Sequence, residues 1–162
     1  MTSSDFPRGQ RPGDWFICHD AAADALTAAS IRDEFARWLR RHTGLDETRL
    51  CDVLLSLNEA LANVAEFAYL AGPAGTCDVE AVRDRDRRTL TVTVVDRGRW
   101  READAANRRR HRGRGIPLMR TLADALVIDP SAVGTVVRMR FHDVHAGRPA
   151  AVVIEEATPA GT

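Results

Sequence analysis

Residues 76–96, TCDVEAVRDRDRRTLTVTVVD, hold two runs in which apolar and polar residues alternate, separated by a charged stretch. Alternation with a period of two is typical of β-strands, because successive side chains point to opposite faces of a sheet. We therefore predict strands over residues 76–84 and 89–96, joined as an antiparallel hairpin. The chain is then expected to build a sheet that includes this pair.

Two helices are predicted before the hairpin. Apolar residues recur at helical spacing over residues 21–42, and Gly44 is expected to end that helix. In the second helix Asp46 is the expected N-cap, and apolar residues recur with a period of about 3.6 as far as Ala68. A short strand candidate, residues 14–20, precedes both helices.

After the hairpin comes a segment with neither period, residues 97–112, whose length is typical of a lid or binding loop. A short helix is predicted over 115–125, and a second hairpin from strands at 125–129 and 133–141. Residues 150–156, AAVVIEE, are a candidate for an extra edge strand. The order of elements predicts an α/β two-layer sandwich, with a mixed, mostly antiparallel sheet covered on one face by helices.

The domain organisation follows from length and composition. The 162 residues suit one domain over 14–141, with a flexible N-terminal tail at 1–13 and a C-terminal tail at 142–162. The apolar fraction of 44% and the charged fraction of 28% are typical of a soluble globular protein. Formal net charge is zero, so no global field favours nucleic acid or an anionic membrane as a partner.

Several residue types narrow the function classes. All 23 basic residues are arginine, which excludes mechanisms that need a lysine, including the lysine-bearing P-loop. Three well-separated cysteines are typical of reduced thiols in a cytosolic protein. No apolar run approaches the ~18 residues needed to span a bilayer, and the N-terminus has no apolar leader segment. We therefore expect a cytoplasmic location.

The second helix carries a polar pair within the stretch LLSLNEALANVAEFAY. Glu59 and Asn63 are spaced i, i+4, so they lie one turn apart on one face, which they share with Ser56 and Ala60. This small, polar face suits a hydrated metal ion: the amide oxygen can ligate Mg²⁺, and the carboxylate can orient or deprotonate a hydroxyl. The alternative is a solvated helix face, which the spacing alone favours.

Three weaker motifs follow along the chain. Asp96 ends a strand, and Gly98 follows two residues later. The carboxylate can accept a hydrogen bond from an exocyclic amine while the glycine lets a flat ring lie close to the backbone, but the same pattern is also common in ordinary turns. Gly113 and Gly115 precede a helix, where bare N–H groups can approach a phosphate, or where the chain simply turns. Thr135 opens the last strand, and its hydroxyl can hydrogen-bond Asp96 or an ordered water.

The order of these four motifs resembles the Bergerat-fold (GHKL) ATP-binding superfamily, which gyrase and the histidine kinases share. The resemblance covers roughly residues 15–141, and "NEALAN", "DRG" and "GRG" look like its N, G1 and G2 boxes. Within the superfamily, "DRGRWR" and "GRGIPLMRTLAD" are similar to actinobacterial members of the anti-sigma factor serine/threonine kinases of partner-switching systems.

That resemblance implies a Mg²⁺·ATP-dependent kinase that silences a sigma factor and phosphorylates an anti-anti-sigma (STAS-domain) protein, and it implies a homodimer. Glu59 would be the general base for the serine hydroxyl, and Asn63 the Mg²⁺ ligand. Asp96 would accept from the adenine amino group, with Gly98 beneath the ring and Thr135 supporting the carboxylate. The remaining ATP-binding residues would be Gly113, Arg114, Gly115 and Ile116.

The chain departs from this family at one position in the N box. Family members usually carry a histidine four residues after the asparagine, where this chain has Phe67. The departure motivates a second hypothesis, an ATP-binding regulatory protein that sequesters a partner with little or no kinase activity. A stand-alone histidine kinase catalytic domain is a third reading, although no phosphoacceptor helix pair is evident.

Two further groups of side chains admit bland readings. The predicted lid is rich in arginine, with Arg108, Arg109, Arg110, Arg112 and Arg114. One or two of these can pair with phosphate oxygens, whereas most are expected to be solvated, and without nearby aromatic partners RNA binding is disfavoured. His142 and His145 suggest a metal pair, but surface histidines are the favoured reading because no cysteine or carboxylate cluster accompanies them.

Overall fold

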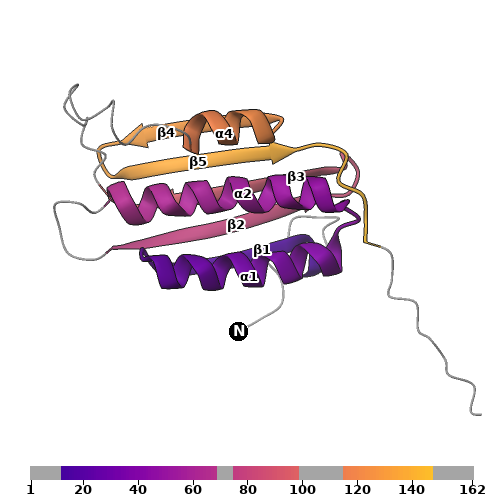
Figure 1. The fold of residues 1–162 in the computed structure, drawn as a ribbon, viewed down its shortest axis with the longest axis horizontal. Coiled ribbons are helices and arrows are strands. Elements are labelled where there is room, and N and C mark those ends of the chain that lie inside the picture. Colours follow the sequence, from indigo (N-terminus) through magenta and orange to yellow (C-terminus); the bar gives the residue numbers. More distant parts are fainter. Residues whose placement is uncertain (1–11, 69–74, 99–114, 148–162) are drawn as a thin grey trace, which may run out of the picture.

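The computed structural model describes residues 12–68, 75–98 and 115–147. The helices and strands are η1 (Pro12–Asp14), β1 (Trp15–Ala22), α1 (Ala25–His42), α2 (Glu47–Asn63), η2 (Val64–Ala68), β2 (Thr76–Asp84), β3 (Thr89–Asp96), α4 (Gly115–Leu122), β4 (Ala125–Ser131) and β5 (Gly134–Phe141). The three α-helices lie together on one face of a single sheet (Figure 1). The α/β two-layer sandwich expected from the sequence is confirmed.

The sheet has five strands in the order β1-β2-β3-β5-β4, and every pairing among them is antiparallel. The central hairpin forms as predicted, and in its register Asp84 lies opposite Thr89 at the turn and Cys77 lies opposite Asp96 at the open end. The sheet is thus antiparallel throughout rather than mixed. Two of the four pairings, β2–β3 and β4–β5, are hairpins, in which strands joined by short turns run in opposite directions, whereas β1 pairs with β2 across two helices and β3 pairs with β5 across α4 and β4.

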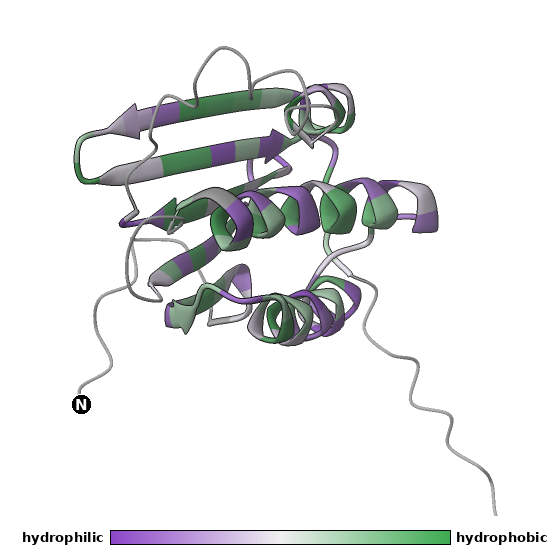
Figure 2. Ribbon diagram, turned by 60° about the vertical axis from the view of Figure 1, so that its left-hand side comes forward, coloured by the Kyte–Doolittle hydropathy of each residue, from purple (hydrophilic) through white to green (hydrophobic). Residues whose placement is uncertain are grey.

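The core lies between the sheet and the helices. Along β2 and β3 buried residues alternate with partly exposed ones, as expected for strands with one covered face. Figure 2 shows the apolar stripes of the helices turned toward the sheet. Phe35 of α1 is fully buried and packs edge-on against Phe16 of β1 with ring centroids 5.0 Å apart, so this helix is fixed to the sheet by aromatic packing.

The starts of two helices follow from their caps. Asp24 caps α1, accepting a hydrogen bond from Thr27 N at 2.7 Å, so the helix begins at Ala25 rather than at residue 21 as predicted. Ala21 and Ala22, predicted to be helical, belong to the end of β1 instead. Asp46 is the N-cap of α2 as predicted, accepting from Arg49 N at 2.7 Å.

The ends of two helices differ from the sequence prediction. The α-helical period of α2 ends at Asn63, and Val64–Ala68 forms a π-helix, for which periodicity gives no signal. Helix α4 ends at Leu122, three residues earlier than predicted, because Ala125 already pairs with Arg140 in the β4–β5 ladder.

A buried ionic cluster joins the N-terminal 3-10 helix to the sheet. Arg83 and Asp14 are almost fully buried and lie 2.8 Å apart, and Arg85 Nε donates to the same carboxylate at 2.7 Å. Arg83 also donates to the carbonyl oxygen of His42 at the end of α1. The cluster therefore ties η1, β2 and α1 together, and we name it the Asp14–Arg83 cluster.

Two further expectations concern a candidate edge strand and membrane-spanning helices. The candidate edge strand at residues 150–156 lies outside the described residues. No helix within the described ranges is long and apolar enough to cross a membrane.

Candidate functional site

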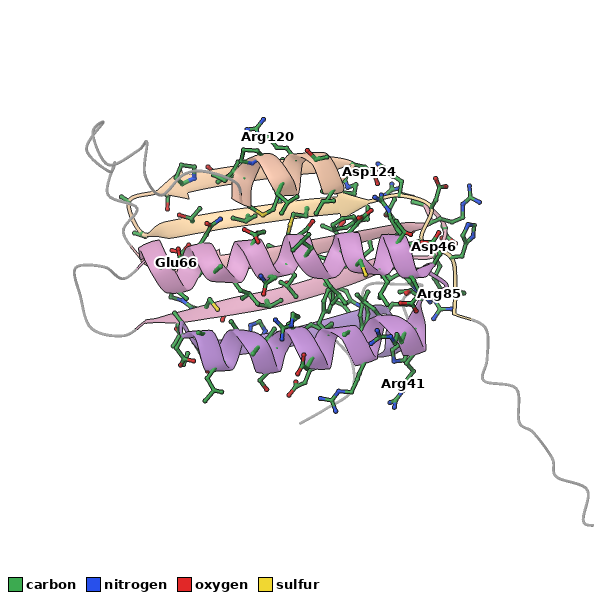
Figure 3. All side chains as sticks on the ribbon, in the orientation of Figure 1. Arg41, Asp46, Glu66, Arg85, Arg120 and Asp124 are labelled. Atoms are coloured by element: carbon green, nitrogen blue, oxygen red, sulfur yellow. The ribbon has the colours of Figure 1, made fainter. Side chains whose placement is uncertain are left out.

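The antiparallel topology brings the ends of several elements together at one end of the molecule. Strand β3 ends there at Asp96, β5 begins there, α2 runs into η2, and α4 begins at Gly115 (Figure 1). In Figure 3 Glu66 marks this end of the α2–η2 segment, and Asp46 marks the opposite end. The residues that the sequence singled out in three motifs are therefore gathered by the fold.

Glu59 and Asn63 of α2 meet the first residue of α4. A methyl group on the α-carbon of Gly115 would lie 2.9 Å from Glu59 Oε2 and 3.6 Å from Asn63 Oδ1. Any side chain at 115 would therefore press on the carboxylate. Glycine leaves Glu59 and Asn63 beside the N-terminus of α4, where free N–H groups and the helix dipole favour an anion.

The face that carries this pair differs from the sequence prediction in one respect. Ser56 and Ala60, expected to complete a small polar surface, are fully buried, and the Ser56 hydroxyl donates to the carbonyl oxygen of Asp52 at 2.8 Å. Glu59 and Asn63 are half-buried, since α2 packs against α4 on this side. This part of α2 is therefore a partly covered face, on which Glu59 and Asn63 keep some contact with solvent.

Asp96 is a carboxylate placed inside the protein. It is only 3% exposed, and its Oδ1 accepts a hydrogen bond from Gly98 N at 2.9 Å. Burial raises the pKa of the Asp96 carboxyl above its ordinary value, while bonds from the N–H groups of Gly98 and Thr135 oppose that shift. A buried carboxylate at a strand end, away from any arginine partner in the described contacts, is suited to receive a donor from a ligand.

Thr135 lies directly opposite Asp96 in the β3–β5 register and is 1% exposed. The hydroxyl lies close enough to affect the Asp96 carboxyl, yet within the described residues its Oγ1 makes no hydrogen bond of acceptable geometry. Unsatisfied buried hydroxyls are rare because they cost free energy. The Thr135 hydroxyl thus lies beside the Asp96 carboxyl, where it can donate to that carboxyl or to a ligand.

Gly98 is required by a close approach of two backbone segments. A methyl group on its α-carbon would lie 2.1 Å from the carbonyl oxygen of Ala68, the last residue of η2. The D-x-G motif thus locks the end of β3 against the π-helix that follows Asn63. This contact links the Asp96 region to the Glu59 region through the backbone.

A residue next to Asp96, which the sequence did not single out, braces the same strand end. Arg97 donates to Asp78 Oδ2 at 2.6 Å and to Thr76 Oγ1 at 3.2 Å. These contacts join the end of β3 to the start of β2. Only the strand register, which requires the three-dimensional pairing, identifies them.

The remaining predicted site residues divide into two groups. Ile116 is half-buried and packs against the core in the first turn of α4. Gly113, Arg114, the other lid arginines and the side chain of Phe67 lie outside what the structure describes.

The two histidines lie far from this end. His142 and His145 are exposed and line a cleft of about 410 Å³ at the opposite end of the molecule, together with Asp46, Arg49 and Asp124 (Figure 3). Among the described residues no group of three metal-ligating side chains forms a metal site. The surface reading of these histidines agrees with their exposure.

Comparisons with known proteins bear on the family and on the fold. Residues 21–141 match the family described as histidine kinase-like ATPase domain. A search of curated proteins found no match. The crystal structure of the RsbU and RsbW domains of Rv1364c from Mycobacterium tuberculosis is similar, with a TM-score of 0.63 and 21% sequence identity over 84% of this chain and 33% of that chain. This chain thus spans about a third of that one, and the likeness at this identity is one of fold.

Proposed function

Because the chain belongs to the histidine kinase-like ATPase domain family, we propose that it is a Mg²⁺·ATP-dependent serine/threonine protein kinase that acts as an anti-sigma factor. In this proposal the kinase sequesters a sigma factor and phosphorylates an anti-anti-sigma (STAS-domain) protein, and it works as a cytoplasmic homodimer. The matched family accounts for nucleotide binding, whereas the choice of acceptor and partners rests on the motifs.

The observation that carries the proposal is the contact of Glu59 with the start of α4. A carboxylate 2.9 Å from the position of a Gly115 β-carbon lies where a helix N-terminus favours phosphate oxygens. A passive nucleotide-binding protein has no need of a carboxylate there. A kinase does, since a hydroxyl that attacks phosphorus must lose its proton.

The residues would share the work as follows. Asp96, which has Thr135 opposite it and accepts from Gly98 N, would hold the adenine. Gly98 would lie beneath the ring, and Asn63 would ligate Mg²⁺. The bound Mg²⁺ would neutralise charge on the phosphate oxygens.

The first turn of α4 and the segment before it would complete the nucleotide site. In this proposal Gly113, Arg114, Gly115 and Ile116 would line the phosphate site, and the N–H groups at the start of α4, which begins at Gly115, would face the phosphates.

In the transfer step, the serine oxygen of the partner bonds to the γ-phosphorus of ATP. The bond from that phosphorus to the bridging oxygen breaks, which leaves ADP, and the hydroxyl proton passes to the Glu59 carboxylate. No covalent bond to the kinase itself is needed, so positioning carries the catalysis.

Substitution of Glu59 tests the proposal. We expect Glu59→Gln to bind ATP within about threefold of the wild-type affinity and to lose at least about 100-fold in the rate of partner phosphorylation, since general-base catalysis is removed. Glu66→Gln is the matched control, because Glu66 is an exposed glutamate at the same end of the α2–η2 segment. Undiminished phosphorylation by Glu59→Gln would refute the assignment.

The second candidate is an ATP-binding regulatory protein that sequesters its partner with little or no transfer. It is favoured by Phe67, which cannot hydrogen-bond where family members carry histidine. The same experiment decides between the two. A wild-type protein that binds Mg²⁺·ATP and its partner, yet leaves the partner's serine unmodified over hours, identifies the second function.

A further inference from the structure

Cys77 lies beside the proposed base-binding carboxylate. In the sheet register it is directly opposite Asp96 in the β2–β3 ladder, and Asp96 is directly opposite Thr135 in the β3–β5 ladder. Side chains opposite one another in neighbouring antiparallel strands lie on the same face, with β-carbons about 4.5–5.5 Å apart. The three side chains therefore form one row at the end of the sheet, which we name the base row.

All three members of the base row are buried, at 2%, 3% and 1% exposure respectively. Burial, the largest cause, raises the pKa of the Cys77 thiol to about 11, so at neutral pH it remains a neutral, weakly polar group. Thr135 contributes a hydroxyl that is unpartnered within the described residues. The row thus combines an acceptor, an unsatisfied hydroxyl and a soft apolar surface, which together suit the edge of a heterocyclic base.

We propose that Cys77 is a specificity-determining residue, whose small thiol leaves Asp96 open to the base and forms one wall of the base site. The inference rests on the proposed function, because it takes Asp96 as the residue that receives the adenine. A larger side chain at position 77 would extend over the neighbouring carboxylate. An alanine at position 77 would leave Asp96 open to the base but would remove the contact between the base and the Cys77 sulfur.

A pair of enlargements on the buried face of β2 tests this wall, with Cys77→Val, which like Val79→Leu adds one heavy atom, as the size-matched variant. Cys77→Leu and Val79→Leu both add bulk to the buried face of one strand, two residues apart, and Val79 pairs with Val94 rather than with Asp96. By calorimetry with Mg²⁺·ADP we expect Cys77→Leu to bind at least about 10-fold more weakly and Val79→Leu within about twofold of wild type. Cys77→Val, a smaller enlargement, replaces the first variant if that one does not fold.

Alkylation provides a second readout that does not depend on turnover. N-ethylmaleimide adds to the thiolate: a carbon–sulfur bond forms, the carbon–carbon double bond is consumed, and the other carbon takes a proton from water. In a Cys18→Ala/Cys51→Ala protein only Cys77 can react, and in a Cys51→Ala/Cys77→Ala protein only Cys18. Buried Cys77 reacts only when the native structure opens, whereas Cys18 is partly exposed. We expect saturating Mg²⁺·ADP to slow modification of Cys77 at least about 10-fold more than the ligand-linked gain in unfolding free energy of the same protein accounts for, and to slow that of Cys18 less than about threefold.

The outcomes separate this inference from the function on which it rests. If wild-type protein binds ADP while Cys77→Leu and Cys77→Val bind it as tightly, the inference is overturned and the nucleotide site stands. Equal protection of Cys18 and Cys77 also overturns it. If the wild-type protein itself gives no heat with Mg²⁺·ADP, the proposed function fails first.

Discussion

Two glycines of the site tolerate a methyl group differently, because different atoms stand in its way. At Gly98 the obstacle is the backbone oxygen of Ala68, 2.1 Å from the added carbon, whereas at Gly115 it is the tip of the Glu59 side chain at 2.9 Å. A backbone segment can move only with the structure around it, while a carboxylate can rotate away. Stability and activity are therefore expected to separate at these two positions.

We predict that Gly98→Ala loses about 1–3 kcal/mol or more of unfolding free energy, as overpacking does, together with nucleotide binding. Gly115→Ala is expected to keep or gain stability, by up to about 1 kcal/mol from helix propensity, while phosphoryl transfer falls because Glu59 is displaced. Denaturant titration and a transfer assay on both variants measure this. Equal loss of stability in the two would contradict the prediction.

Burial of the charged Asp96 carboxylate lowers the stability of the folded protein. A carboxyl whose pKa is raised on folding binds its proton more tightly in the native state, so stability falls as pH rises from the unfolded pKa through the folded one. Above that window the cost of the buried charge is constant. An amide of the same shape avoids the cost.

We therefore predict that Asp96→Asn has a higher Tm than wild type at pH 7, that the difference shrinks as the pH is lowered toward 4, and that Mg²⁺·ADP binding weakens at least about 10-fold. Thermal melts across this range, with Asp129→Asn as an exposed control on β4, measure it. A lower Tm for Asp96→Asn at pH 7 would show that the buried charge is not a net cost.

Among the helices and strands, most of the correct predictions rest on helix caps and on the alternation of apolar and polar residues. The hairpin at 76–84 and 89–96 and the Asp46 cap are as the sequence predicts, because alternation and capping are local properties. The sequence predicted neither the π-helix at Val64–Ala68 nor the early end of α4, because both depend on contacts with other elements. Local pattern cannot report such contacts.

The candidate site divides in the same way. Spacing placed Glu59 and Asn63 on one helical face, and the order of motifs implied Asp96, but neither indicated that Gly115 contacts the first pair. Cys77 gave no signal at all, because only the strand register brings it beside Asp96. The burial of Ser56 was missed since its hydroxyl bonds to its own helix, which hides its polarity from the pattern.

The Asp14–Arg83 cluster makes the packing of η1, β2 and α1 depend on one carboxylate, that of Asp14. Removing Asp14 leaves the guanidinium of Arg83, only 2% exposed, with no counterion in the described contacts. We predict that Asp14→Ala lowers the unfolding free energy by about 3–5 kcal/mol, as breaking a buried ion pair does, whereas Asp86→Ala in the exposed β2–β3 turn changes it by less than about 0.5 kcal/mol. Urea unfolding of both variants measures this.

For the whole molecule, ligand binding and folding are linked. A ligand that binds only the native state adds about 2.7 kcal/mol of stability at 100 times its Kd. We predict that Mg²⁺·ADP at that excess raises the Tm of the wild type by about 5–10 °C, given about 2–4 °C per kcal/mol in a domain of this size, and that of Asp96→Asn by no more than about half as much, because its Kd is at least about 10-fold higher. A differential scanning melt measures the shift, and an equal shift in both proteins would place the nucleotide elsewhere.

The short 3-10 helix at Pro12–Asp14 sets a limit on how the gene can be shortened. A shortened protein that starts at Trp15, where β1 begins, would keep every strand and helix of the sandwich. It would lack Asp14, however, whose carboxylate neutralises the buried charge of Arg83. Such a product is expected to come out of the cell as insoluble material. Recombinant versions, and fusions made at the amino end, should keep everything from Pro12 onward.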